Sequence, residues 1–181
     1  MRPDSVPACI LALLRLRGGP QDLPYSHGLL WKLILLSLLV DLVASHWLAA
    51  QQGSVLRILV VSGFSLLLPW WLLSWAGKRA RFVQTLSALL ATGLVLSLVF
   101  LPLAVRAIDH GMTQPDATPT PQQAMLAWLI LIVVVWKVMV TAHIWRQALE
   151  WPLAGGVAVS VALMLLELGF DRLLWGAGWT Y

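Results

Sequence analysis

Five stretches of mostly apolar residues follow one another along the chain, separated by polar connections. Each is long enough to cross a membrane, because a helix needs about 20 such residues to span the hydrocarbon core. Only 11% of the residues are charged, which is too few to cover a water-soluble globule, since roughly a quarter are charged in a typical soluble domain. We predict an all-α polytopic membrane protein, a bundle of five transmembrane helices, at about 28–50, 55–76, 83–105, 124–147 and 152–174.

Residues 1–27 precede the five-helix transmembrane domain, which covers residues 28–181. The apolar run "ACILALL" is too short for the core of a signal peptide, and two arginines follow it on the wrong side. We therefore expect residues 5–17 to form a short interfacial helix on the cytoplasmic surface. In this arrangement apolar residues such as Ile10 and Leu13 dip into the bilayer, and the arginines face the lipid headgroups.

The segment "RGGPQDLPYSHG" joins the interfacial helix to the first spanning helix. Gly18 and Gly19 can end the interfacial helix, and Pro20 prevents its continuation. Ser26 is placed to cap the first spanning helix. We interpret the segment as a rigid elbow, and the alternative is a turn that docks a partner protein. The residues that define this elbow are Gly19, Pro20, Gln21, Asp22 and Pro24.

Basic residues are distributed unevenly over the predicted connections. With the N-terminus in the cytoplasm most of them fall on the cytoplasmic side, which is the bias that short loops show in membrane proteins. We therefore predict a cytoplasmic N-terminus and a periplasmic C-terminus. The excess of arginine over lysine hints at a bacterial source, and hence at the bacterial inner membrane. A cytoplasmic basic face for anionic lipid or a partner would consist of Arg15, Arg17, Lys78, Arg79 and Arg81.

Three ionisable side chains lie well inside the apolar stretches, namely Asp41, Lys137 and Glu167. At ~1.5 Å per helical residue they lie ~18, ~15 and ~21 Å from the cytoplasmic side, near the middle of the bilayer. Charges at this depth are costly and usually face a partner inside the bundle. We predict an intramembrane polar cluster in which Lys137 pairs with Asp41, Glu167 or both.

Three roles for this cluster remain open. An ion pair can fix the register of the helices and hold the bundle together. The same residues can instead form an ion or proton path. A third arrangement pairs Lys137 with an acid on a partner protein.

The sequence contains none of the motifs on which common enzyme chemistry depends. H-E-x-x-H, G-x-S-x-G and a Gly-rich phosphate loop are all absent. A single cysteine, Cys9, excludes an intrachain disulfide and a Cys-based metal site. We therefore expect no enzyme activity, no cofactor and no metal. The net charge of +4 reflects the cytoplasmic basic residues, so no nucleic-acid partner is expected.

The layout of the chain resembles that of small bacterial proteins of the Yip1-domain family. The resemblance lies in five spans, an N-terminal apolar segment, a proline-containing elbow and an exoplasmic C-terminus. It is carried by "LLRLRGGPQDLPYSHGLLWKLI", before and into the first span. The chain lacks the long hydrophilic N-terminal region of eukaryotic members. The resemblance implies a non-enzymatic membrane scaffold or adaptor.

These features together predict a non-enzymatic accessory or scaffold protein of the inner membrane, in contact with the lipid bilayer. It would bind a membrane-protein partner or form a homo-oligomer, and the charged cluster would hold its helices together. The alternative is a small transporter or channel, in which Asp41, Lys137 and Glu167 line an ion or proton path.

Overall fold

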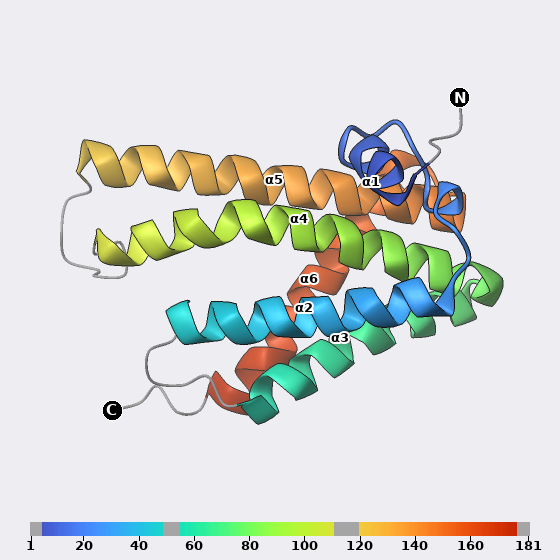
Figure 1. The fold of residues 1–181 in the computed structure, drawn as a ribbon, viewed down its shortest axis with the longest axis horizontal. Coiled ribbons are helices and arrows are strands. Elements are labelled where there is room, and N and C mark those ends of the chain that lie inside the picture. The colour runs from blue at the N-terminus through green and yellow to red at the C-terminus, as the bar shows by residue number, and fades with distance from the viewer. Residues whose placement is uncertain (1–4, 49–54, 111–119, 177–181) are drawn as a thin grey trace.

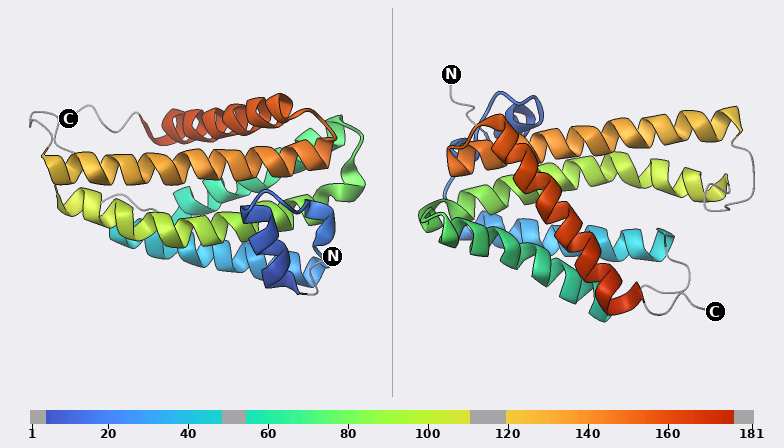
Figure 2. Two further views of the ribbon diagram at one scale, coloured as in Figure 1. Left: turned by 90° about the horizontal axis from the view of Figure 1, so that it is seen from above. Right: turned by 180° about the vertical axis from the view of Figure 1, so that it is seen from behind.

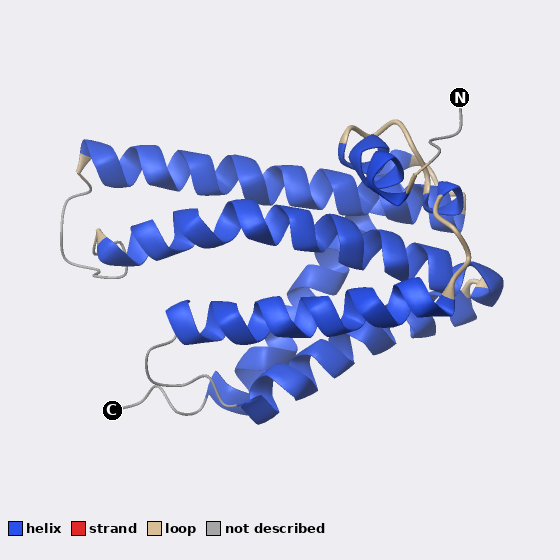
Figure 3. Cartoon of the chain, in the orientation of Figure 1, coloured by secondary structure: helices blue, strands red, loops and turns tan. Residues whose placement is uncertain are grey.

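The computed structural model of the chain describes residues 5–48, 55–110 and 120–176. The regular elements in these residues are all helical (Figures 1 and 3). Five helices are long and apolar enough to cross a membrane, which confirms the predicted all-α architecture with five spans. The elements are α1 (Val6–Leu14), η1 (Pro20–Asp22), α2 (His27–Leu48), α3 (Val55–Trp75), η2 (Arg79–Arg81), α4 (Phe82–Asp109), α5 (Pro121–Leu149) and α6 (Leu153–Trp175).

The connection between α4 and α5 is shorter than the sequence predicts. The predicted spans end at about 105 and resume at about 124, but α4 continues to Asp109 and α5 begins at Pro121. The start of α5 is fixed by reciprocal hydrogen bonds: the Thr120 N–H donates to Gln123 Oε1 at 2.8 Å, and the Gln123 N–H donates to Thr120 Oγ1 at 3.3 Å. The middle of the connection lies outside the described residues.

The spanning helices run alternately in opposite directions, and α6 crosses the others obliquely. α2 packs against α3 and α4, and α5 packs against α4 and α6. Figure 1 shows α6 passing behind the bundle from the end of α5 to the beginning of α3, and Figure 2 shows the same diagonal from behind. Near the end of α6, the rings of Phe64 and Phe170 stack with their centroids 3.9 Å apart. α6 therefore leaves α5 along its length and meets α3. We call the end of the bundle that carries α1 the α1 end.

The bundle is packed tightly toward the α1 end. Buried side chains of α3 fall within 68–73, those of α4 within 83–96, and those of α5, with one exception, within 140–149. In this half α5 and α6 approach closely, since a Cβ atom at Gly156 would lie 2.3 Å from the carbonyl oxygen of Ala142. The half away from the α1 end buries far fewer side chains, because the helices diverge there.

The N-terminal helix packs against protein where the sequence suggested lipid. α1 lies against α4 and α5 (Figure 1). Leu13 is 0% exposed and is clustered with Cys9, Ala88 and Ile144, and Ile10 packs against a neighbouring core cluster. The prediction that Leu13 and Ile10 dip into the bilayer is therefore wrong. The reason is that α4 presents small side chains such as Ala88, which let a helix approach closely.

α1 also ends earlier than expected. Its last residue is Leu14, and Leu16 takes the left-handed conformation (φ 58°) that usually falls to a glycine. The side chain of Leu16 packs against the core cluster around Leu13, which offsets the backbone cost of this conformation. Gly18 and Gly19 therefore do not stop the helix, and both belong to the elbow.

Side chains of α4 and α5 hold the elbow against the bundle. His143 Nε2 lies 2.7 Å from the carbonyl oxygen of Gly18, and it carries the proton because a carbonyl can only accept. Gln84 Nε2 donates to the carbonyl oxygen of Leu23 at 2.8 Å. Ser26 Oγ accepts a hydrogen bond from the N–H of Leu29 at 3.2 Å, so it caps α2 as the sequence predicts. The elbow is thus a docked part of the fold.

Candidate functional site

Three spanning helices place a polar stripe on one face. Side chains four residues apart on a helix lie on the same face, and α2 and α5 both carry polar residues at that interval. The stripe on α6 is spaced at seven and four residues, which keeps the same face. Its members are Ser37, Asp41 and Ser45 on α2, Lys137, Thr141 and Trp145 on α5, and Ser160, Glu167 and Asp171 on α6.

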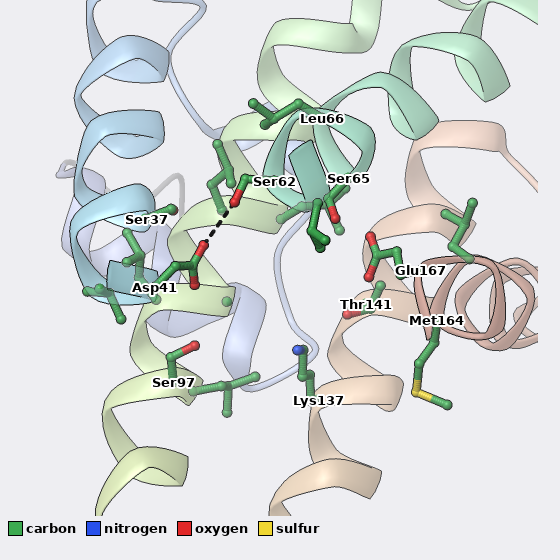
Figure 4. Close-up of a pocket in the computed structure, with 18 of the residues that line it drawn as sticks. Ser37, Asp41, Ser62, Ser65, Leu66, Ser97, Lys137, Thr141, Met164 and Glu167 are labelled. Carbon is green, nitrogen blue, oxygen red and sulfur yellow. Dashed lines mark hydrogen bonds between the residues drawn. The ribbon is translucent and has the colours of Figure 1, made fainter. Parts of the chain in front are cut away.

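All three stripes line one cavity of about 740 Å³. Figure 4 shows Asp41, Lys137 and Glu167 among the residues that line it, and every spanning helix contributes to its wall. Trp145 lines it toward the α1 end, and Arg57 and Asp171 line it toward the opposite end. Asp41 and Lys137 are exposed side chains, so the cavity communicates with the surroundings of the protein. Its volume falls in the range of sites for drug-sized molecules, about 300–1,000 Å³.

Lys137 lines the cavity without a direct ion pair to either acid. Asp41 accepts a hydrogen bond from the Ser62 hydroxyl at 3.3 Å (Figure 4). Every ion pair within the described residues involves other side chains. The predicted contact of Lys137 with Asp41 or Glu167 is therefore not formed, although all three line one cavity. Glu167 is carried away from Lys137 because α6 diverges from α5, and Asp41 lies on α2, which packs chiefly against α4.

A bidentate ion pair joins α3 to α6 at the end opposite α1. Arg57 Nε lies 2.8 Å from Asp171 Oδ1, and its NH2 lies 2.6 Å from Oδ2. The guanidinium carbon of Arg57 also lies 5.9 Å from the centroid of a Trp175 ring. The sequence analysis did not single out this pair. Their spacing of 114 residues gives no local signal, and only the shared outer depth could have suggested it.

Two buried polar atoms near the α1 end of the cavity have no hydrogen-bond partner. They are Trp145 Nε1 and Ser160 Oγ, whose residues are 1% and 4% exposed and line the cavity. Buried polar groups are nearly always satisfied in native proteins. A molecule in the cavity, or ordered water, would have a donor and a hydroxyl to bind at this point.

The predicted cytoplasmic basic face divides into two groups. Lys78 Nζ lies 2.5 Å from Glu150 Oε2, and Arg81 also pairs with Glu150. These two hydrogen bonds, first from Lys78 and then from Arg81, hold the pKa of the Glu150 carboxyl below its usual range. Arg81 NH1 also donates to the carbonyl oxygens of Gln147 and Ala148 at the end of α5, at 3.2 Å each. Lys78 and Arg81 thus tie the connection between α3 and α4 to the end of α5.

The remaining basic residues of this face, Arg15, Arg17 and Arg79, are exposed at the α1 end. The guanidinium of Arg79 lies over a ring of Trp70, 5.8 Å from the centroid. Nothing in the sequence marked Glu150 as the residue that divides the face, because its partners lie about 70 positions away.

The elbow residues serve mainly to build the fold. The N–H of Gly19 donates to Asp22 Oδ2 at 2.8 Å, which closes the η1 turn, and Pro20 is buried. Gln21 and Pro24 are exposed. A smaller cavity of about 270 Å³ lies beside Pro20 and Gln21, between the elbow and the ends of α4 and α5.

No protein-family model matches the chain, and no curated protein or solved structure is significantly similar to it. The resemblance to the Yip1-domain family therefore stays a prediction from layout. The function has to be argued from the cavity itself.

Proposed function

We propose that the chain is a small membrane transporter that takes a charged solute into the cavity between its five spanning helices. The observation that carries the proposal is that Lys137, Asp41 and Glu167 share a cavity without pairing. All three line one cavity of about 740 Å³, and no ion pair joins them. Residues that served only to hold helices together would be in contact, because an unpaired charge in a membrane is costly.

The packing of the bundle supports this proposal. The α1 end is tightly packed below the cavity, with Leu73 and Trp145 fully buried there. A site near the middle of the membrane that is blocked toward one side is what alternating access requires of each conformation. Opening the cavity toward the α1 end would require movement where α6 contacts α5.

We assign the protein to the bacterial inner membrane, with the α1 end in the cytoplasm. The support is the excess of basic residues at that end, where Arg15, Arg17 and Arg79 are exposed. A reporter enzyme that is active only in the periplasm, fused after residue 181, should therefore be active. Activity of a cytoplasmic reporter at the same point would reverse the orientation.

The proposal is tested by removing one positive charge at a time. Lys137→Met keeps the length of the side chain and breaks no ion pair, so we expect the variant to be as abundant in the membrane as the wild type. Arg57→Met is the matched control, because it breaks a bidentate pair that is about one-third exposed. We expect it to lose about 1–2 kcal/mol of unfolding free energy.

The scaffold role predicts the opposite outcome. If Lys137 held the helices together, Lys137→Met would lower the amount of folded protein in the membrane. The second change Asp41→Leu would then restore it. That pair of results would contradict a cavity for a solute.

The scaffold role remains the second candidate because of one observation. Arg15, Arg17 and Arg79 form an exposed basic surface at the α1 end, which suits anionic lipid or an acidic partner. Affinity purification from mild detergent, followed by mass spectrometry, would find a stoichiometric membrane partner if this role dominates.

A further inference from the structure

The charges that line the cavity do not sum to zero. The ionisable side chains in its wall are Asp41 on α2, Arg57 on α3, Lys137 on α5, and Glu167 and Asp171 on α6, and α4 contributes none. Three acids against two bases leave one negative charge when all are ionised. Arg57 and Asp171 neutralise each other in their bidentate pair. The excess charge therefore belongs to the part of the cavity around Asp41, Glu167 and Lys137.

An excess charge between apolar helices is unfavourable unless another charge compensates it. Building on the transport function above, we propose that the cavity binds an organic monocation with an apolar body. The positive group lies between Asp41 and Glu167. The apolar body contacts side chains of the same wall, such as Leu66, Val134 and Met164.

The shape of the cavity favours a molecule over a bare metal ion. Trp145 and Lys137 are eight residues apart on α5, which corresponds to ~12 Å along the helix. The unpartnered atoms Trp145 Nε1 and Ser160 Oγ belong to the same wall, and Trp145 lies about two helical turns from Lys137. A ligand of drug-like size can reach both regions, whereas one ion cannot.

A proton can supply the same positive charge when no cation is bound. The cation and the proton then compete to compensate the same excess negative charge. Binding of the cation should release a proton, and its affinity should therefore rise as the pH is raised.

Two probes of equal shape and opposite charge test this directly. The full-length protein in lipid nanodiscs is titrated with tetraphenylphosphonium and separately with tetraphenylborate, and the heat from empty nanodiscs is subtracted. We expect saturable binding of the phosphonium alone, tightening as the pH rises. Asp41→Asn and Glu167→Gln each remove an acid, so each should weaken binding about tenfold or more. Lys137→Met increases the excess negative charge, so it should tighten binding.

Binding of the borate as well as of the phosphonium would overturn the proposal, because the charge of the ligand would not matter. Unchanged phosphonium affinity in both Asp41→Asn and Glu167→Gln would overturn it too. If the phosphonium does not bind although Lys137→Met remains abundant in the membrane, the cargo class is wrong and the transport function stands. Loss of Lys137→Met from the membrane, with recovery on the second change Asp41→Leu, would refute the transport function itself.

Discussion

The close approach of α5 and α6 makes Gly156 sensitive to the addition of a side chain. A Cβ atom at this position would lie 2.3 Å from the carbonyl oxygen of Ala142 and 3.1 Å from the backbone nitrogen of Arg146. Ordinary carbon–oxygen contacts begin at about 3.3 Å. Gly156→Ala therefore forces the two helices apart by roughly 1 Å, because neither backbone atom can rotate away.

The energetic cost follows from two opposing effects. Overpacking of this kind costs about 1–3 kcal/mol, while alanine improves helix propensity over glycine by about 1 kcal/mol. Gly169→Ala on the same helix is the matched control, because a Cβ there meets nothing within 4 Å. We expect Gly169→Ala to be neutral or slightly stabilising. Gly156→Ala should then be less stable than Gly169→Ala by about the overpacking cost alone, 1–3 kcal/mol.

Both variants can be unfolded with SDS from mild detergent micelles and followed by tryptophan fluorescence. The midpoint should fall for Gly156→Ala and stay the same or rise for Gly169→Ala. Equal midpoints for the two variants would refute the reasoning, because they would mean that α5 and α6 are not in backbone contact at Gly156.

Two further predictions concern residues at the α1 end. The lowered pKa of Glu150 stabilises the folded state above the unfolded-state pKa, and this contribution disappears as the pH falls through the folded-state value. Glu150→Gln, which lacks the charge throughout, should flatten the acid limb of the melting temperature against pH, and an unchanged limb would exclude the role of Lys78 and Arg81. Burial, with a smaller effect of Asp22, raises the pKa of the Cys9 thiol. Maleimide should therefore label Cys9 far more slowly than it labels a cysteine placed at the exposed position of Ser5 in a Cys9→Ala background. Equal labelling rates would contradict the docked position of α1.

The helices could be predicted because each is specified locally. About 20 apolar residues and a capping group such as Ser26 or Thr120 are enough to define a span. The polar cluster could be predicted only as a set of residues at similar depth. Whether Lys137 contacts an acid depends on the course of α6, and contacts far apart in the sequence fix that course. Gly156 holds α6 near α5 at one end, and Phe170 holds it near α3 at the other.

The docking of α1 could not be predicted for the same reason, because it depends on contacts between residues far apart in the sequence. The apolar face of residues 6–14 is suited both to lipid and to protein, and its composition cannot distinguish them. The deciding feature is the small-residue surface of α4 around Ala88, together with the hydrogen bond between His143 and the carbonyl of Gly18. Ala88 and His143 both lie far from α1 in the sequence. Only the folded arrangement brings them to the same place.

The central claim is that the middle of the bundle holds a cavity lined by charged side chains, and thiol accessibility tests it most directly. Ser97 lines the cavity on α4, whereas its neighbour Leu98 is 65% exposed on the outer face. Each is changed to cysteine in a Cys9→Ala background, and vesicles are treated with trimethylammonium-ethyl methanethiosulfonate, a water-soluble cation. We predict that Ser97→Cys reacts and Leu98→Cys does not, because lipid covers the latter. Absence of reaction at Ser97→Cys, or equal reaction at both positions, would contradict a water-filled cavity at the depth of the three charges.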